Sequence, residues 1–506
     1  MIKIVISMKT LKNLIICAIL FCSATSCSDF LDKEPNQLGT GNFYQTDEEA
    51  EQAVNAVYNV FYNFYQNHVG FDVDCLSDDI VKGHGTDFAD YNSFNTGQML
   101  ASNAAIKSLW SDYYAGIYRA NMVLDNVKEQ SKVSEIKKKQ VLGESYFLRA
   151  YFYYQLVQRY GGVPIILTTI DQPKSPARET VEVVYGQIEE DLIDAIELLE
   201  YASDAVVGRP NKGTAICLLG LVYLSQNNFS DCYKTLKPVV DNKDGKYNYS
   251  LIQDLSKMYQ ISNNNGPESV FEIQAREAAP LGQTMAYNHW VRPRGMSKRG
   301  GLGFPMPTLS LYNEFEPGDL RREATILKEG DFIASELVDD EGNNILFQAS
   351  WAPETGMNCA KYVKWVNVGD YQERSGQNKK LIRYAEVLLA FAEAAYAENH
   401  SDEAWKAIKT IRQRAFGTEN PTMYSSDFIT ALRHERRVEL ATENRRYFDL
   451  IRWGIAEQVL TADCKKHTNY NLPYSYNKLA NGLYPIPQAE LDVNNNPGFA
   501  QNEGYK

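Results

Sequence analysis

Apolar residues recur at helical spacing near the start of the chain. Between residues 50 and 64 they stand at alternating steps of four and three, which places them on one face of an α-helix. These residues are Ala50, Val54, Val57, Phe61 and Phe64. The preceding Thr46-Asp47-Glu48-Glu49 has the Thr and Glu of a capping box. We therefore predict an amphipathic helix with Thr46 as its N-cap.

Three more helices are predicted in the first half, over residues 104–127, 136–160 and 179–199. The second of these has apolar or aromatic side chains almost all round, which is typical of a helix buried between neighbours. Gly161-Gly162-Val163-Pro164 follows it and predicts its end. The third is amphipathic, with one apolar face.

Two later segments share a spacing that predicts close helix pairs. Gly220 precedes Cys232 by twelve positions, and Ala392 precedes Ala404 by the same interval. Small residues facing each other at this interval let two antiparallel helices pack closely, as in a degenerate tetratricopeptide repeat. Since a long stretch separates the two segments, the fold must bring their helix pairs together.

That intervening stretch, residues 241–378, differs in composition from the rest. It holds a strand-like segment at 269–274 and Gly- and Pro-rich loops from 279 to 307. Loops on a rigid helical scaffold often carry binding sites, so we expect ligand contacts here. The predicted organisation is a signal peptide at 1–26, a tether at 27–43, helical regions at 44–240 and 379–506, and this loop-rich region between them.

The first residues predict export and lipidation. Three lysines precede a short apolar run at residues 14–22, and small residues at 23–26 lead to Cys27. This pattern is typical of a secretory signal, because the run is too short to span a bilayer. It also resembles a bacterial lipobox, in which Cys27 receives the lipid. The alternative is an ordinary cleavage site beside an unrelated cysteine.

Charge and cysteine content exclude some functions. The chain has a formal net charge of −13, which disfavours nucleic acid as a partner because phosphates need a basic surface. Five cysteines follow Cys27 without a CxxC pair, so we predict no disulfide framework. Cys217 and Cys232 are expected in helices as core residues.

Catalytic signatures are largely missing. The sequence has no HExxH, P-loop, dinucleotide fingerprint or Gly-x-Ser-x-Gly elbow, so we predict a protein that binds rather than catalyses. The acidic stretch from Asp72 to Asp90 is interpreted first as turn and N-cap carboxylates. Sugar-hydroxyl acceptors and a calcium site remain alternatives, although the Gly and distal Glu of an EF-hand are missing. No cofactor is predicted.

Several short motifs together resemble the SusD/RagB family of outer-membrane nutrient-binding lipoproteins of Bacteroidetes. They include Trp110-x-x-x-Tyr114, Phe147-Leu148-Arg149-Ala150-Tyr151, Tyr160-Gly161-Gly162-Val163-Pro164, Leu381-Ile382-Arg383-Tyr384-Ala385-Glu386, Glu435-Arg436-Arg437-x-Glu439-Leu440, Arg446-x-Phe448-Asp449-Leu450-x-Arg452-Trp453 and Tyr484-Pro485-Ile486-Pro487. The resemblance implies a mostly α fold of four tetratricopeptide-like helix pairs with a loop-rich region of short strands. It also implies a lipid anchor in the cell outer membrane, palmitate included, and a SusC-like TonB-dependent transporter as partner.

The charged residues among these motifs are interpreted as structural. Their alternating signs at helical spacing predict an ion-pair network that locks the last helices together. These residues are Glu435, Arg436, Glu439, Arg446, Asp449 and Arg452. Arg149 and Arg383 are expected to bond carbonyls or carboxylates between helices.

Candidate ligand residues lie in two loops that combine rings with short polar side chains. Sugars need flat aromatic faces for their C–H surfaces and polar groups for their hydroxyls. The candidates are Asp87, Phe88, Tyr91 and Asn92 in the first loop, Tyr287, Asn288, Trp290 and Arg292 in the second, and Trp351 as a weaker third aromatic. The resemblance implies that the family's ligand face lies in these two regions.

The cargo remains open on sequence alone. Arg292, Arg294, Lys298 and Arg299 cluster in an acidic protein, which favours either an acidic polysaccharide or a basic loop that touches the transporter. The leading hypothesis is capture of an oligo- or polysaccharide and its delivery to the transporter. Import of peptides on the same scaffold, and a surface scaffold for degradative enzymes, are the alternatives.

Overall fold

The computed structural model describes residues 43–67, 70–202, 205–276, 286–296, 300–333, 342–364, 375–467 and 472–505. The signal peptide, Cys27, most of the tether and the basic residues Lys298 and Arg299 lie outside these ranges. Within them, no helix combines the length and apolar character needed to span a membrane.

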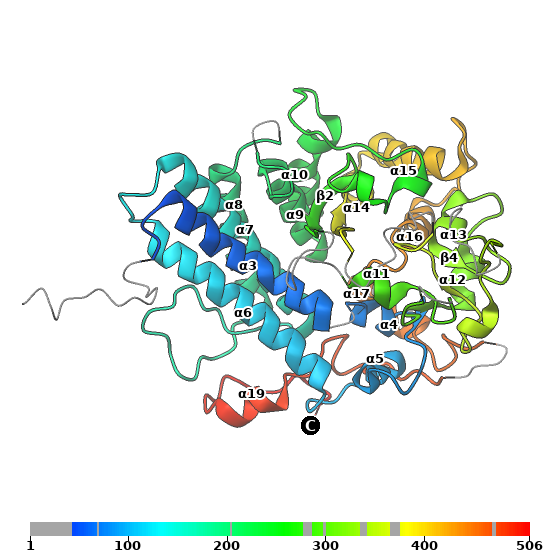
Figure 1. Cartoon of the computed structure of the whole chain (residues 1–506), viewed down its shortest axis with the longest axis horizontal. Helices are drawn as coiled ribbons and strands as arrows, with labels where there is room; N and C mark the ends of the chain where they lie inside the picture. Colours follow the sequence, from blue (N-terminus) through cyan, green and yellow to red (C-terminus); the bar gives the residue numbers. More distant parts are fainter. Residues whose placement is uncertain are drawn as a thin grey trace, which may run out of the picture.

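Four long helices lie side by side and form the left half of the molecule in Figure 1. They are α3 (Asp47–Asn67), α6 (Ala104–Val127), α7 (Glu135–Tyr160) and α8 (Val181–Leu198). The predicted capping box is confirmed, since the Thr46 amide donates to Glu49 Oε2 at 3.0 Å and the Glu49 amide donates to Thr46 Oγ1 at 3.2 Å. The predicted end of α7 is confirmed at Gly161, whose φ of 71° few other residues adopt.

Two shorter helix pairs continue this array, as the twelve-residue spacing predicts. They are α9 (Lys212–Ser225) with α10 (Phe229–Asp241), and α14 (Tyr384–Ala397) with α15 (Ser401–Phe416). A Cβ placed on Gly220 would lie 2.3 Å from Leu236 Cδ2, so only glycine permits this approach of α9 and α10. The pairs α3–α6, α7–α8, α9–α10 and α14–α15 are the four predicted by the family resemblance.

The long insertion between α10 and α14 returns the chain to the same stack. Helix α10 packs directly on α14, where the rings of Tyr233 and Phe391 stack with centroids 5.5 Å apart. Lys237 of α10 also forms a 2.8 Å ion pair with Glu403 of α15. Helices that are neighbours in the stack are therefore not always neighbours along the chain.

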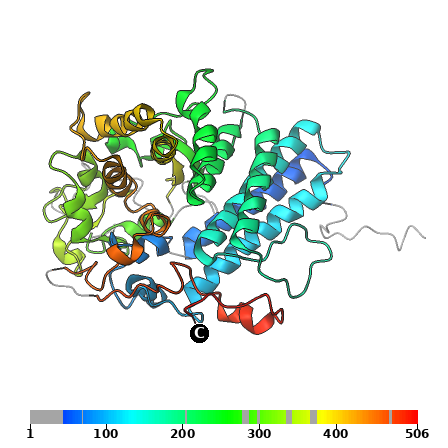
Figure 2. The same cartoon turned by 180° about the vertical axis from the view of Figure 1, so that it is seen from behind.

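Short elements form the other half of the molecule, on the right in Figure 1 and on the left when it is viewed from behind in Figure 2. The helices there are α4 (Asp72–Leu76), α5 (Asn92–Thr96), α11 (Tyr287–Val291), α12 (Leu309–Glu314), α13 (Leu320–Thr325), α16 (Phe428–Glu439), α17 (Arg446–Arg452) and α18 (Ala456–Val459), with 3-10 turns η1 (Ala89–Tyr91), η2 (Leu255–Lys257), η3 (Ile261–Asn263) and η4 (Ala349–Trp351). Helix α19 (Gln488–Val493) lies below α6. The described part is thus rich in helices, as predicted.

Three two-stranded antiparallel sheets join distant parts of the chain. Strand β1 (Ile80–Val81) pairs with β3 (Met306–Pro307), β2 (Ser269–Ile273) with β6 (Lys379–Arg383), and β4 (Ile326–Leu327) with β5 (Asn358–Cys359). The predicted strand at 269–274 is therefore confirmed. The first sheet fixes the loop after residue 81 beside the segment that precedes residue 306.

The predicted ion-pair network of the last helices is confirmed in part. Asp449 of α17 accepts from Arg436 of α16 at 2.8 Å and from Arg452 at 2.9 Å. Arg452 also pairs with Glu393 of α14 at 2.6 Å. Arg446 differs, since its partner is Asp78 near the N-terminus, at 2.9 Å. Spacing along one helix reports local neighbours only, which is why this partner was missed.

The network reaches further than the last helices. Glu439 of α16 accepts from Arg414 of α15 at 2.6 Å, from Arg383 of β6 at 3.0 Å and from Arg321 of α13 at 3.4 Å. Glu268 accepts from Arg414 at 2.8 Å and from Arg383. All of these side chains are almost completely buried. Arg149 likewise pairs with Asp191 between α7 and α8 at 2.6 Å, as expected of it.

The interpretation of the acidic stretch as turn and N-cap carboxylates was wrong for Asp72, Asp78 and Asp79. Asp72 pairs with Arg159 at 2.8 Å, and Asp79 with Arg437 at 2.8 Å. Asp78 lies between Arg437 and Arg446, at 2.8 and 2.9 Å. These carboxylates are buried and paired with arginines far away in the chain. Asp78 and Asp79 thereby hold this segment on the C-terminal helices, and Asp72 holds it on α7.

Five cysteines are described, and none forms a disulfide. Cys217 and Cys232 are fully buried in α9 and α10, as predicted.

Replacing Glu439 with Gln is expected to lower the free energy of unfolding by about 3–5 kcal/mol, because three arginines lose a buried counter-charge. Urea-induced unfolding measures this change. The control Glu457→Gln breaks an exposed pair with Lys478 and should change stability by less than about 1 kcal/mol. Equal effects of the two substitutions would contradict a stabilising role for the network.

Candidate functional site

The structure brings the two predicted ligand loops together. The rings of Phe88 and Trp290 meet edge to face with centroids 4.6 Å apart, and Asp87 forms an ion pair with Arg294. The pairing of β1 with β3 and a 2.8 Å bond from the Thr308 amide to the Asp79 carbonyl hold the roots of both loops. Residues some 200 positions apart thus share one surface, here named the loop surface.

Aromatic rings form the centre of the loop surface. Phe88 is 40% exposed, and Phe304 supports it from below with ring centroids 6.0 Å apart. Trp290 is only 7% exposed, because it lies beneath Phe88. Trp351 is partly buried and lies close against Gly295, since a Cβ on Gly295 would stand 2.0 Å from its Cδ1 atom. The third aromatic candidate therefore belongs to the same surface.

Other predicted ligand residues lie inside the fold. Tyr91 is 3% exposed and packs between Phe71 and Phe94, with ring centroids 5.8 and 5.3 Å away. Tyr287 is also buried, and the Lys379 ammonium lies 3.6 Å from the centre of its ring. These two tyrosines support the loops from within.

The polar candidates also divide into buried and partly exposed residues. Asn288 and Arg292 are buried, and Arg292 Nη2 lies 3.0 Å from His289 Nδ1. Asp87 and Asn92 are partly exposed, and the Asn92 amide donates to the Gly85 carbonyl at 2.8 Å. Asp87, Phe88 and Asn92 are therefore the predicted residues that reach solvent most directly.

Sequence reasoning missed two polar groups at this surface. His84 Nε2 and Glu354 Oε2 are buried atoms without a hydrogen-bond partner in the described part of the chain, as is Trp290 Nε1. Burial, and then the Arg294 guanidinium, lower the pKa of His84, so its imidazole is neutral at pH 7. In the sequence, the position of His84 between Gly83 and Gly85 is the feature that could have indicated a loop residue at this surface.

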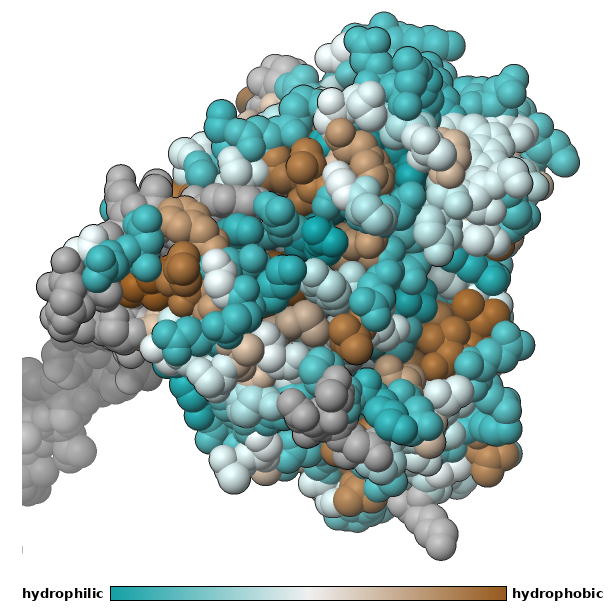
Figure 3. All heavy atoms as spheres, turned by 90° about the vertical axis from the view of Figure 1, so that its right-hand side faces the viewer, coloured by the Kyte–Doolittle hydropathy of each residue, from teal (hydrophilic) through white to brown (hydrophobic). Residues whose placement is uncertain are grey.

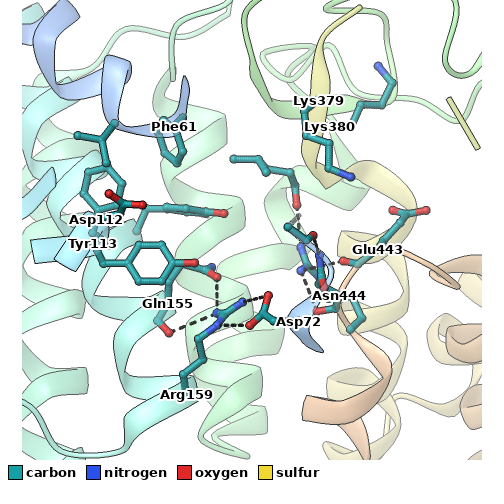
Figure 4. Close-up of a pocket in the computed structure, with 16 residues that line it drawn as sticks. Phe61, Asp72, Asp112, Tyr113, Gln155, Arg159, Lys379, Lys380, Glu443 and Asn444 are labelled. Atoms are coloured by element: carbon teal, nitrogen blue, oxygen red, sulfur yellow. Dashed lines mark hydrogen bonds and ion pairs between the residues drawn. The ribbon is translucent and has the colours of Figure 1, made fainter. Parts of the chain in front are cut away.

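An internal cavity lies where the four-helix half meets the short elements (Figure 4). Arg159 reaches into it and donates to Asp72 at 2.8 Å and to Gln155 Oε1 at 2.9 Å. Lys379 and Glu443 line its far side. Its volume is about 40 Å³, which holds a few water molecules and is too small for a sugar ring. We interpret it as a hydrated junction between the two halves.

One group of side chains in the described part has the ligand types of a metal site. Glu316, His434 and Glu435 bring one ligand atom each within 4.8 Å of one another. Arg412 already donates to Glu316 at 2.8 Å and also to Glu435. A fixed cation at this point neutralises both carboxylates, so the group fits an ion-pair network better than a metal ion.

The exterior beside the loop-rich half is mainly hydrophilic. Figure 3 shows this side with separate apolar patches among polar residues. Exposed large apolar side chains in the described part include Leu320 and Leu346, besides Phe88. The loop surface therefore differs from its surroundings in its clustered rings.

Two family models match this chain in succession. The model of the SusD family matches residues 228–505, and a model described as starch-binding associating with outer membrane matches residues 29–224. A SusD-like protein P2 of Formosa agariphila is 26% identical, over 95% of this chain and 98% of the relative.

Solved structures agree with these matches. A laminarin-binding SusD-like protein is 27% identical, with a TM-score of 0.74 over 91% of this chain and 100% of the other. A SusD-like protein of Bacteroides fragilis is 24% identical, with a TM-score of 0.75 over 92% of this chain and 98% of the other. The second likeness concerns the fold alone.

Glu443, which lines the cavity, is expected to make the stability of the protein sensitive to acid. Burial by itself would raise the pKa of this carboxyl, but Arg383 and Lys361 outweigh it and lower the pKa to about 2. A depressed pKa adds stability above the unfolded value of about 4.5 that is lost as pH falls through the folded value. The stability difference between wild type and Glu443→Gln should therefore shrink between about pH 4.5 and 2. Urea unfolding across this range measures it. A difference that stays constant over this range would contradict the assignment.

Proposed function

This chain belongs to the SusD family, and from that premise we propose that it binds a glycan without catalysis and delivers it to a SusC-like TonB-dependent transporter. The observation that carries the proposal is the loop surface, where the exposed ring of Phe88 stands on Trp290 beside polar atoms of His84 and Glu354 that have no partner among the described residues. The likeness to a laminarin-binding protein supports a polysaccharide as ligand.

In the proposed complex, one sugar ring stacks on Phe88 and a second contacts Trp351. Each such contact contributes about 0.5–1.5 kcal/mol beyond the apolar area that it buries. Asp87, Asn92 and Arg294 surround the rings and offer acceptors and donors for hydroxyl groups. The buried candidates Tyr91, Tyr287, Asn288 and Arg292 would act by holding the two loops in place.

We further propose that residues 1–26 are removed on export, that Cys27 carries the lipid, and that residues 27–43 tether the fold to the outer membrane. The sequence before Cys27 supports this, and so does the family description that mentions the outer membrane. A tethered binding protein keeps its cargo near the transporter, which raises the effective concentration of the ligand there.

Phe88→Ala is expected to weaken glycan binding about threefold to tenfold, because it removes a stacked ring worth about 1 kcal/mol. Screening a glycan array that includes laminarin identifies the ligand, and isothermal titration calorimetry then measures the affinity. Trp290→Phe, which keeps the packing beneath Phe88 but removes the unpaired indole N–H, should weaken binding as well.

The matched control is Tyr118→Ala, which removes a 53% exposed ring from α6. It should leave the affinity unchanged. Unaltered binding by a folded Phe88→Ala protein would remove the loop surface from the proposal, and binding of peptides instead of glycans would contradict the class of ligand.

Cys27→Ala is expected to abolish incorporation of labelled palmitate, because the thiol is the only proposed attachment point. Metabolic labelling followed by immunoprecipitation measures this. Cys464→Ala, which alters a half-buried cysteine of the folded part, should retain the label. Continued labelling of the Cys27 variant would disprove the assigned anchor.

A further inference from the structure

A second concave surface lies on other elements, away from the loop surface. It is a groove of about 640 Å³ between the outward face of α3, the end of β2 and the loop at residues 205–209. Its lining includes Gln52, Asn55, Tyr58, Asn59, Tyr62, Arg209, Gln274 and Arg276. The volume falls within the usual range of about 300–1,000 Å³ for sites that bind small molecules.

The floor of the groove is fixed by a buried carboxylate. Glu144 of α7 is completely buried and accepts from the Tyr58 hydroxyl at 2.8 Å and from Arg209 Nη1 at 2.7 Å. Arg209 lies over the Tyr58 ring at 4.8 Å and donates to Asn55 at 2.5 Å. Ring, guanidinium and amide are therefore held in position before any ligand arrives.

One wall of the groove is equally well defined. Gly208 has a φ of 85°, and a Cβ there would stand 2.6 Å from Gln274 Cδ, so the loop and β2 are in close contact. The amides of Gln274 and Asn265 bond each other reciprocally, at 2.8 and 2.9 Å. A rigid wall lowers the conformational cost of binding.

Several polar groups of the groove are not used by the fold. The Tyr62 hydroxyl is buried and has no hydrogen-bond partner among the described residues. Asn59 and Arg276 are exposed, and no ion pair of Arg276 occurs in the described part. Glu272, the acid that lines the groove, is already paired with Lys380. The groove therefore carries an exposed guanidinium in a chain of net charge −13.

From this geometry we infer a second binding site, in which the α3–β2 groove holds an oligosaccharide that carries a carboxylate. Tyr62 supplies an aromatic face and a hydroxyl for a sugar ring, and Tyr58 holds Arg209 in place beside it. Asn59 supplies both a donor and an acceptor for sugar hydroxyls. Arg276 supplies the planar donor pair that suits a carboxylate.

The inference rests on the proposed function in taking a glycan as the ligand. The location of the second site in the groove is argued independently of it. Glycans held at two separate surfaces of one molecule gain affinity through multivalency when one chain reaches both. A polysaccharide with some acidic residues would thus bind the loop surface through its uncharged sugar rings and the groove through its carboxylates.

The test uses the folded protein from residue 28 onward and two probes, a hexamer of galacturonic acid and its neutral methyl ester. Calorimetry should show that Arg276→Ala weakens binding of the acidic hexamer by about tenfold or more, the worth of a charge-assisted hydrogen bond. Tyr62→Phe, which removes only the unpartnered hydroxyl, should weaken it about threefold to tenfold. Arg276→Lys should recover part of the affinity, because it restores the charge.

Matched controls separate this site from the loop surface. Tyr118→Phe removes an exposed hydroxyl elsewhere and should have no effect, and Phe88→Ala should weaken neutral glycans while binding of the acidic hexamer persists. Equal affinity for the acidic hexamer and its ester, or unchanged binding by Arg276→Ala and Tyr62→Phe, would overturn the inference. Displacement of the hexamer by an extended neutral peptide would overturn the assignment of a sugar.

Discussion

The buried pairs between arginines and carboxylates are the constraint on which the rest of the structure depends. Glu439 has three guanidinium partners on three different elements. Asp78, which lies just after α4, pairs with two arginines of the C-terminal helices. A buried charge without its partner costs several kcal/mol, so each pair permits only one arrangement of the segments that it joins. In this way charge specifies how the short elements close on the helical stack.

This constraint also determines what reaches the surface. Asp79 is held by Arg437. The Lys82 amide donates to Asn95 Oδ1 at 2.8 Å, so the loop from residue 82 to residue 95 begins and ends at fixed points. Phe88 is therefore carried outward on a supported loop, above Trp290. The α3–β2 groove depends on a different buried carboxylate, Glu144. The two surfaces can consequently be altered independently by mutation.

Much of the helical scaffold could be predicted, because its signals are local. The helix at 104–127 has its predicted bounds, since Asn103 caps its start with a side-chain bond to the Ile106 amide at 3.2 Å. The twelve-residue interval from Gly220 to Cys232 identified a helix pair for a similar reason: a small residue leaves room for its neighbour wherever the pair lies. The joining of the two predicted loops agreed with what the family resemblance implied, and no local signal predicted it.

The sequence by itself determined the helices, their ends and the residue types available for a sugar, because periodicity, capping and composition act over a few neighbouring positions. Only the tertiary structure decided that Tyr91 and Tyr287 are buried while Phe88 is exposed. It also decided that the acidic stretch pairs with arginines far along the chain, and that α3 and β2 enclose a groove. Exposure and charge pairing depend on which distant segments come together, and no local pattern encodes that information.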